Sequence, residues 1–244
     1  MKSVVIGGTA GVGRELALAL ATKGHSLLIT GKDKQDVDKC VSDLQIRYGV
    51  EVIGVSVDAT IHESYLKVLK DAASNFGPIV NIFLPIGSSN ELDKTNLENS
   101  ESNKIISSNF MSVVLAIQAL NSQFHESEKV TIVGFSSIAA IRGRGSNVIY
   151  SASKRALESF FESLRVNYFD TNIHVKYYRL GYLDTHQSYG KQLLFPKKDP
   201  KKIANNIITN LNRKRLVEYD PQYWRLVAVL IRNSPISLYR KFAP

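Results

Sequence analysis

The stretch that decides the fold lies at the start of the chain, where residues 3–13 read SVVIGGTAGVG. The apolar run over residues 3–6 predicts a strand, and the glycine-rich loop after it leads into a helix that begins near residue 12. Glycine lets a backbone turn sharply and approach a pyrophosphate closely, and a helix N-terminus attracts anions. The spacing alone also fits a simple tight turn, but its place between the first strand and the first helix favours dinucleotide binding. The loop residues expected to contact the dinucleotide are Gly7, Thr9, Ala10, Gly11, Val12 and Gly13.

The rest of the chain continues the alternation of strands and helices. Short runs rich in β-branched residues predict strands at residues 3–6, 26–30, 51–57, 80–84, 129–135, 174–179 and 216–219. Longer patterns of helical period occupy residues 13–23, 34–48, 63–76, 102–125, 150–169 and 200–212. This alternation predicts an α/β, Rossmann-like, doubly wound parallel sheet of about seven strands with helices on both faces. Because no internal repeat or low-complexity linker is present, residues 1–244 are expected to form a single domain.

Composition narrows the class of protein. A chain of 244 residues with 44% hydrophobic residues can bury a full core, which excludes disorder as its main state. A lone cysteine, Cys40, excludes an internal disulfide and a cysteine-rich zinc site, and we expect no metal. The apolar runs are shorter than a membrane span, and the first residues lack the pattern of a signal peptide. We therefore expect a cytoplasmic protein.

The formal charge of +9 is unevenly distributed along the chain. Residues 1–190 hold 19 Lys and Arg against 19 Asp and Glu, whereas residues 191–244 hold 12 against 3. The whole excess of positive charge therefore lies in the last 54 residues. A nucleic-acid-binding protein would show a broader basic surface, so we expect no nucleic-acid partner.

The second predicted strand ends at Thr30-Gly31-Lys32-Asp33, where a dinucleotide fold contacts the adenosine ribose. A cation at this place can pair with a 2′-phosphate, so Lys32 favours NADP(H) over NAD(H). Asp33 keeps NAD(H) open as the alternative, and Lys32 can also be a solvated loop residue. After the third strand, Asp58 is expected to contact the adenine, to cap the helix that begins near residue 61, or to do both.

A second group of polar residues follows the fifth predicted strand. Ser137 comes directly after it, and Tyr150 and Lys154 lie four residues apart in a helical segment, which places both on one helix face. A phenol is a poor acid or base at neutral pH, but a neighbouring ammonium lowers its pKa, and a serine hydroxyl can orient a substrate oxygen. A Tyr-x3-Lys pair alone is more often a surface feature, and the serine together with the glycine loop favours catalysis.

These motifs together make the chain resemble a single-domain short-chain dehydrogenase/reductase over residues 4–219. The resemblance implies that Tyr150 is the general acid/base and that Lys154 lowers its pKa and holds the nicotinamide ribose. It also implies that Ser137 polarises the substrate carbonyl. Asn109, in the run Ser-Asn-Phe at residues 108–110, would support a water-mediated proton relay. The hydride itself belongs to the nicotinamide.

The chain departs from the family pattern at two places. Where the family carries Asn-Asn-Ala-Gly after the fourth strand, this chain reads Leu-Pro-Ile-Gly at residues 84–87. Only Gly87 matches, so we expect backbone contacts to the cofactor there. After the sixth strand Leu180 replaces the usual proline, whereas Gly181 and Thr185 match and are expected to contact the cofactor.

The substrate side is expected to comprise two loops and the C-terminal segment. Residues 186–199 should form an apolar wall, and Arg142 and Arg144 are either solvated, which we favour, or recognise an anionic substrate. Residues 222–244 predict a basic amphipathic helix. This helix either packs on its own domain or a partner subunit, which we favour, or makes peripheral contact with an anionic membrane. The resemblance also implies a homodimer or homotetramer.

The sequence therefore predicts an NADP(H)-dependent oxidoreductase that reduces a ketone or aldehyde, or oxidises the secondary alcohol. Its partner is a small-molecule substrate that is apolar, lipid-linked or anionic. The alternative is a nucleotide-sensing or interaction protein on the same fold, which the altered residues 84–86 would favour.

Overall fold

The structure is a computed structural model that describes residues 1–124, 129–184 and 195–242. Within these residues seven strands form one parallel sheet in the order β3-β2-β1-β4-β5-β6-β7. The strands are β1 (Lys2–Val5), β2 (Ser26–Gly31), β3 (Val52–Ser56), β4 (Asn81–Leu84), β5 (Val130–Ser137), β6 (Ile173–Leu180) and β7 (Val217–Asp220). Every strand was predicted to within two residues at each end, and the doubly wound α/β fold is confirmed.

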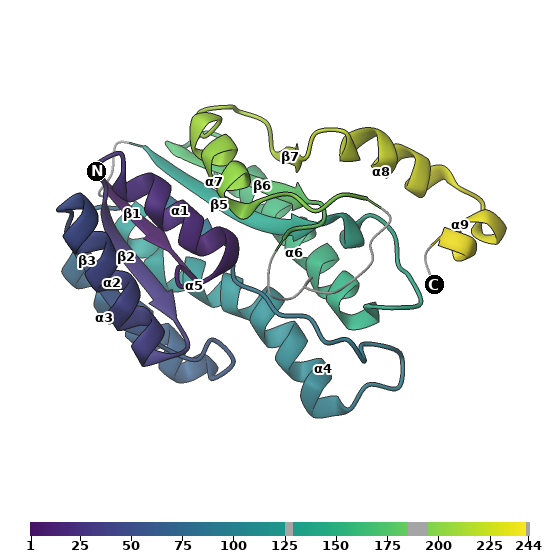
Figure 1. The fold of residues 1–244 in the computed structure, drawn as a ribbon, viewed down its shortest axis with the longest axis horizontal. Helices are drawn as coiled ribbons and strands as arrows, with labels where there is room; N and C mark the ends of the chain where they lie inside the picture. Colours follow the sequence, from purple (N-terminus) through teal and green to yellow (C-terminus); the bar gives the residue numbers. More distant parts are fainter. Residues whose placement is uncertain (125–128, 185–194, 243–244) are drawn as a thin grey trace.

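Helices cover both faces of this sheet (Figure 1). One face carries α1 (Gly11–Ala21), α2 (Lys34–Tyr48) and α7 (Pro200–Thr209); the other carries α3 (His62–Phe76), α5 (Ser112–Leu120) and α6 (Val148–Asn167). Successive residues of β1 therefore enter different cores: Val4 packs with the second set of helices and Val5 with the first. Burial on both faces explains why the strands are apolar at consecutive positions.

The long helix predicted at residues 102–125 is interrupted. The segment comprises α4 (Asn99–Ile106), a π-helical turn η1 (Ser107–Met111), α5 and a 3₁₀ turn η2 (Asn121–Phe124). In the described part of the chain, Asn99–Phe124 is long and apolar enough to cross a membrane by length and composition, contrary to our expectation from the apolar runs. Its residues Val113, Ala116 and Leu120 are fully buried against the sheet, so its place in the core accounts for its hydropathy.

The C-terminal segment forms two helices rather than the single helix predicted over residues 222–244. Helix α8 (Trp224–Asn233) follows β7, and α9 (Ile236–Phe242) begins after Pro235, whose ring cannot continue the preceding helix. Both helices, yellow in Figure 1, extend beyond the body of the sheet. Helix α8 attaches through an apolar cluster formed by Ile138, Ile141, Trp224 and Ala228.

Candidate active site

A cleft of about 1360 Å³ opens at the carboxyl ends of the central strands. Doubly wound sheets bind ligands at this edge, where the strand order reverses, and here it reverses between β1 and β4. The predicted site residues that line the cleft are Gly7, Thr9, Ala10, Gly11, Val12, Lys32, Asp58, Gly87, Asn109, Ser137, Tyr150, Lys154 and Gly181. Gly13 lies behind the loop rather than in the lining, and Thr185 lies outside the described residues.

The glycine loop has the geometry that its sequence predicts. Gly7 and Gly11 have φ angles of 85° and 52°, in the left-handed region that favours glycine. Gly13 has no room for a side chain, because a Cβ atom there would clash with the carbonyl oxygen of Gly7. Helix α1 begins after Ala10, and among the described residues no side chain caps it. Its first N–H groups therefore remain available to an anion.

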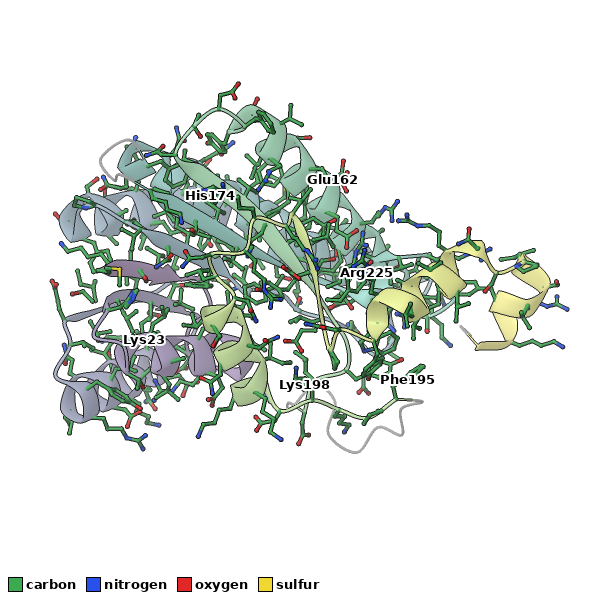
Figure 2. All side chains as sticks on the ribbon, turned by 90° about the horizontal axis from the view of Figure 1, so that it is seen from above. Lys23, Glu162, His174, Phe195, Lys198 and Arg225 are labelled. Atoms are coloured by element: carbon green, nitrogen blue, oxygen red, sulfur yellow. The ribbon has the colours of Figure 1, made fainter. Side chains whose placement is uncertain are left out.

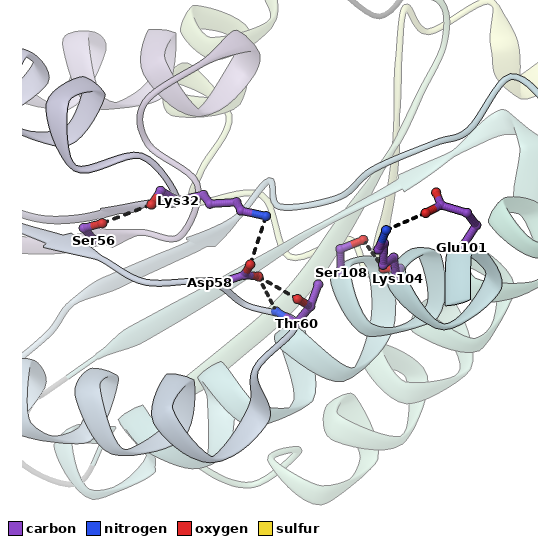
Figure 3. Close-up of polar contacts among 7 residues, drawn as sticks. All are labelled: Lys32, Ser56, Asp58, Thr60, Glu101, Lys104 and Ser108. Carbon is purple, nitrogen blue, oxygen red and sulfur yellow. Dashed lines mark hydrogen bonds and ion pairs between the residues drawn. The ribbon is translucent and has the colours of Figure 1, made fainter. Parts of the chain in front are cut away.

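Lys32 and Asp58 face each other at one end of the cleft (Figure 3). Lys32 Nζ lies 2.9 Å from an Asp58 oxygen, and the Lys32 side chain is 80% exposed. The backbone N–H and the hydroxyl of Thr60 donate to the same carboxylate at 2.9 and 2.7 Å. The bonds from Thr60, with that from Lys32, lower the pKa of Asp58 to about 2. Asp58 thus closes a turn and does not cap α3, whose N-cap is Ile61.

Asp33, the residue that kept NAD(H) open, has a structural role. Its carboxylate accepts the N–H of Asp36 at 3.0 Å and caps α2. Lys32 lines the cleft, whereas Asp33 is not part of the lining formed by the described residues. The tip of β2 therefore presents a cation to the cleft.

Ser137, Tyr150 and Lys154 lie together at the other end of the cleft. Ser137 ends β5 and lines the cleft together with Tyr150; its hydroxyl accepts the N–H of Ala139 at 3.1 Å. One turn along α6 from Tyr150, Lys154 places its Nζ 5.9 Å from the centre of the Tyr150 ring. The same Nζ donates to the carbonyl of Phe135 at 3.0 Å. The fold thus brings together the three side chains that the spacing selected.

Burial dominates the protonation of this group. Burial raises the pKa of Tyr150, although the nearby Ser137 hydroxyl and the charge of Arg144 oppose the shift. Burial also lowers the pKa of Lys154 from 10.5 to about 8. The sequence led us to expect a lowered pKa for Tyr150. In the protein alone the direction is the opposite, because the loss of hydration outweighs the favourable neighbours.

Asn109 is buried in the π-helical turn η1, a kind of turn that is common at functional sites. Its amide donates to the carbonyls of Ser88 and Ile105 at 2.6 and 2.8 Å. Its Oδ1 has no hydrogen-bond partner among the described residues. A Cβ atom at Gly87 would come within 2.5 Å of that oxygen and 3.0 Å of Lys154 Nζ, so glycine keeps this space open. The space suits a water molecule or a ligand group that donates a hydrogen bond.

Asp93 is a residue of this site that sequence reasoning missed. It is 1% exposed in the loop after β4, and its carboxylate accepts the backbone N–H groups of Ile149 and Tyr150 at 2.9 and 2.8 Å. Its own carbonyl accepts the N–H of Asn147 at 2.8 Å. Asp93 therefore caps the helix that carries Tyr150 and Lys154. No local motif identifies it, since its side-chain partners lie 56 and 57 residues away.

The altered segment at residues 84–87 contributes to the cleft through its last three residues. Leu84 is buried in the core, whereas Pro85, Ile86 and Gly87 line the cleft. The backbone of Ile86 lies against Gly7, 3.5 Å from the place of a Cβ atom there. The segment thus presents backbone and apolar surface in place of amide side chains.

An aromatic cluster lies beside the cleft on the side of the C-terminal helices and reaches the cleft lining through Tyr182. The rings of Phe195 and Trp224 lie 4.5 Å apart, and Tyr182 meets Trp224 edge-on at 5.7 Å. Tyr182 and Gly181 line the cleft, and the indole of Trp224 fills the place of a side chain at Gly181. Of the loop predicted to wall the pocket, residues 186–194 lie outside the described residues.

The two arginines predicted near the substrate have different roles. Arg144 lines the cleft. Arg142 donates to the carbonyls of Ile231, at 3.1 Å, and Ser234, and its guanidinium lies 4.4 Å from the centre of the Tyr239 ring. The expectation that Arg142 is solvated or recognises substrate is wrong, because it joins this loop to α8 and α9.

The family model for short chain dehydrogenase matches residues 2–192 of the chain. The protein therefore belongs to the short-chain dehydrogenase family and is an oxidoreductase with a nucleotide-binding fold. The family that the motifs indicated is confirmed.

Individual relatives agree with this assignment. A very-long-chain 3-oxoacyl-CoA reductase of Bos taurus is 26% identical over 99% of this chain and 78% of its own length. An uncharacterized oxidoreductase of Listeria monocytogenes is 27% identical over 67% of this chain, which spans 65% of that relative. A short-chain dehydrogenase from Sphingobium yanoikuyae, solved in complex with NADPH, has a TM-score of 0.83 at 18% identity and covers 97% of each chain. That structural likeness establishes the fold.

Proposed function

We propose that the protein is an NADP(H)-dependent oxidoreductase that interconverts a ketone or aldehyde and its alcohol, with Tyr150 as general acid and base. The observation that carries this proposal is the meeting of two features in one cleft: an anion-binding glycine loop, and the group formed by Ser137, Tyr150 and Lys154. The reductase among the relatives and the NADPH complex of the Sphingobium neighbour support it.

The residues that line the cleft supply the kinds of contact that a nicotinamide dinucleotide would need along its length. The uncapped first turn of α1 would hold the pyrophosphate, Asp58 and Lys32 the adenosine, and Lys154 the nicotinamide ribose. The residues at 85–87 would add backbone contacts. When bound, the nicotinamide supplies or accepts the hydride.

In the reducing direction Tyr150 donates its phenolic proton to the carbonyl oxygen of the substrate, which Ser137 orients. The phenol of Tyr150 is protonated at neutral pH, since its ordinary pKa is near 10 and burial raises it. The Lys154 ammonium then stabilises the phenolate. With its pKa near 8, Lys154 can also pass on a proton from water held at the free oxygen of Asn109.

The preference for NADP(H) rests on Lys32. It is the cation at the tip of β2 that lines the cleft, and its present partner Asp58 leaves the side chain largely exposed. A 2′-phosphate carries more charge than one carboxylate and would compete for this ammonium. The carboxylate beside it, on Asp33, already caps α2.

Cofactor titration of purified variants tests this preference. Lys32→Ala should raise the Kd for NADPH by about 10- to 100-fold, because a hydrogen bond to a charged group is lost, and should leave the Kd for NADH nearly unchanged. Lys34→Ala is the control, since Lys34 is exposed and pairs with Asp38 on α2 at 2.9 Å. Equal weakening of both cofactors by Lys32→Ala would contradict the NADP(H) preference.

A measurement of turnover distinguishes an enzyme from a nucleotide-sensing or interaction protein on the same fold. The wild-type protein should oxidise NADPH with at least one member of a panel of ketones, ketosugars and aldehydes. Tight NADPH binding without turnover on any of them would favour the nucleotide-sensing alternative and contradict the proposed activity.

A further inference from the structure

Helix α8 is apolar on two opposite faces, and its own domain covers one of them. Trp224 and Ala228 are buried in the cluster that attaches the helix. On the opposite face Leu226, Val229 and Leu230 are 73%, 57% and 69% exposed. Their spacing of i, i+3 and i+4 places them in one stripe along the helix. Exposed stripes of this kind mark contact with a partner or a membrane.

Helix α9 adds further exposed apolar side chains at the end of the chain. Ile236 and Leu238 on α9 are exposed, whereas Tyr239 on the same helix is buried. We call the five exposed side chains the tail patch: Leu226, Val229, Leu230, Ile236 and Leu238. Figure 2 shows α8 and α9 projecting beyond the sheet, with Arg225 near the start of α8.

Only positive charge accompanies the tail patch. Residues 221–244 contain no Asp or Glu, and their exposed cations are Arg225, Arg232, Arg240 and Lys241. Three more cations stand beside the start of α8, because Arg213, Lys214 and Arg215 form one shallow basic pocket with Gln222. Residues 221–244 therefore contribute +4 of the formal charge of +9.

The tail patch is held in a fixed position. Arg142 donates to carbonyls at the end of α8, and the hydroxyl of Tyr239 donates to the carbonyl of Arg142 at 3.1 Å. Trp224 contacts Tyr182 and Phe195 on the domain side. These contacts use the side of α8 that bears Trp224 and Ala228, so the stripe formed by Leu226, Val229 and Leu230 on its opposite side stays exposed.

We propose that the tail patch binds the surface of a membrane that contains anionic phospholipids. The apolar side chains of the patch enter the boundary of the acyl chains, while the flanking arginines and Lys241 contact the headgroups. A second copy of this chain fits the patch less well. A two-fold contact would bring two sets of these cations together without an acidic residue in the segment to pair with them.

Flotation of the full chain with lipid vesicles tests the proposal. We expect binding to phosphatidylcholine vesicles that contain about 30% phosphatidylserine, and at least about tenfold weaker partitioning onto phosphatidylcholine alone, since each cation near an anionic surface contributes. This measurement needs neither cofactor nor substrate, so its outcome is independent of the proposed reaction.

Two variants separate the apolar from the charged contribution. Leu226→Ser/Val229→Ser/Leu230→Ser should weaken partitioning onto the anionic vesicles by roughly a hundredfold or more, because three buried aliphatic side chains are lost from the acyl boundary. Arg225→Gln/Arg232→Gln should weaken it by roughly 25-fold, as two cations leave the surface. Both sets are exposed, so circular dichroism and melting temperature should match the wild type.

Matched controls change the same chemistry elsewhere. Ile46→Ser/Phe169→Ser removes exposed apolar side chains outside the tail, and Lys67→Gln/Lys70→Gln removes two exposed cations from α3. Both controls should bind the anionic vesicles as the wild type does.

Three results would overturn the proposal. They are the absence of wild-type binding to anionic vesicles, equal binding to neutral ones, or full binding by the triple serine variant. A fourth result would come from sedimentation equilibrium. If the wild type is a dimer and the triple serine variant is a monomer, the tail patch binds a second copy of the chain instead.

Discussion

Two lysines, Lys154 on α6 and Lys176 on β6, are buried in similar degree and differ in what surrounds them. Burial lowers the pKa of each from 10.5 to about 8. Lys176 donates to the carbonyls of Asn210 and Leu211 at 3.1 and 3.2 Å. Lys154 donates to one backbone carbonyl and otherwise borders the cleft, beside the free oxygen of Asn109.

The contrast shows that a shifted pKa does not by itself identify a functional residue. Lys176 donates to two carbonyl groups that directly follow α7, and the carbonyl of Asn210 also accepts the N–H of Arg213, so the ammonium ties this turn to β6 and has a structural role. Lys154 retains donors that face a space large enough for a ligand. The two lysines are buried alike, and the difference between them is that Lys154 lies beside an open cleft and a polar atom without a partner, the Asn109 oxygen.

The largest expected effect is on turnover. Tyr150→Phe should lower kcat by about 10⁴-fold, because the proton donor is lost, while NADPH binding stays near that of the wild type. Lys154→Met should lower kcat by about 10²- to 10³-fold through the loss of the stabilising cation. Lys176→Met should change kcat by less than about threefold. Steady-state kinetics on the three purified variants provides the measurement.

A double variant sharpens this test. In the proposed mechanism Lys154 acts on the proton of Tyr150, so adding Lys154→Met to Tyr150→Phe should lower kcat little further when NADPH is saturating. Fully additive losses would show that Lys154 acts independently of Tyr150. Adding Lys176→Met to Tyr150→Phe serves as the control and should have no further effect.

The next effect is on stability and its dependence on pH. Because both lysines have lowered pKa values in the folded state, the unfolded state holds more protons between about pH 8 and pH 10.5, and stability rises with pH across that window. Lys154→Met removes a buried charge. The free energy of unfolding of this variant should exceed that of the wild type by about 1–3 kcal/mol at neutral pH. The difference should disappear as the pH approaches the upper end of the window.

Lys176→Met should raise the free energy of unfolding by less at neutral pH, since it also removes the hydrogen bonds to the carbonyls of Asn210 and Leu211, at a cost of about 1–3 kcal/mol. At the upper end of the window it should be less stable than the wild type. Urea unfolding of both variants and the wild type at the two ends of the window gives the comparison. A constant advantage of Lys154→Met at both ends would show that its charge is not the cause.

The smallest effect is expected at the N-terminal cap of α6, the helix that carries Tyr150 and Lys154. Asp93→Asn keeps the shape but loses one of two acceptors for the N–H groups of Ile149 and Tyr150. Unfolding free energy should fall by about 1–2 kcal/mol, and kcat by roughly tenfold because Tyr150 is less firmly placed. Asp33→Asn is the control: it weakens the cap of α2 and should leave kcat unchanged. Equal kcat values for Asp93→Asn and the wild type would restrict Asp93 to stability.

Most of the fold was predictable because periodicity and glycine placement are local properties of the chain. The differences have tertiary causes. Strand β5 runs on to Ser137 although its last residues are polar, since buried Ser136 donates to Glu158 at 2.7 Å. The π-helical turn at Asn109 was not predictable, because its amide is fixed by carbonyl groups that include Ser88, 21 residues away.

The candidate site also contains residues that local spacing predicts and residues that only distant contacts determine. The glycine loop and the group at Ser137, Tyr150 and Lys154 follow from spacing within one element or between neighbouring ones. Asp93 and Arg142 do not, since Arg142 finds its carbonyl partner 89 residues along the chain. The direction of the Tyr150 pKa shift was also missed, because it depends on the degree of burial, which no local pattern records.

The contact between Trp224 and Gly181 shows that the C-terminal segment is not a removable module. A chain cut before α8 would leave an empty space beside the cleft where the indole stands, at a cost of about 3–5 kcal/mol for a lost buried tryptophan. It would also take away the carbonyl groups that hold Arg142, and with them the anchor of the loop that follows Ser137. Truncation would therefore disturb catalysis and surface attachment at once, and only point substitutions on the outward face can separate the two.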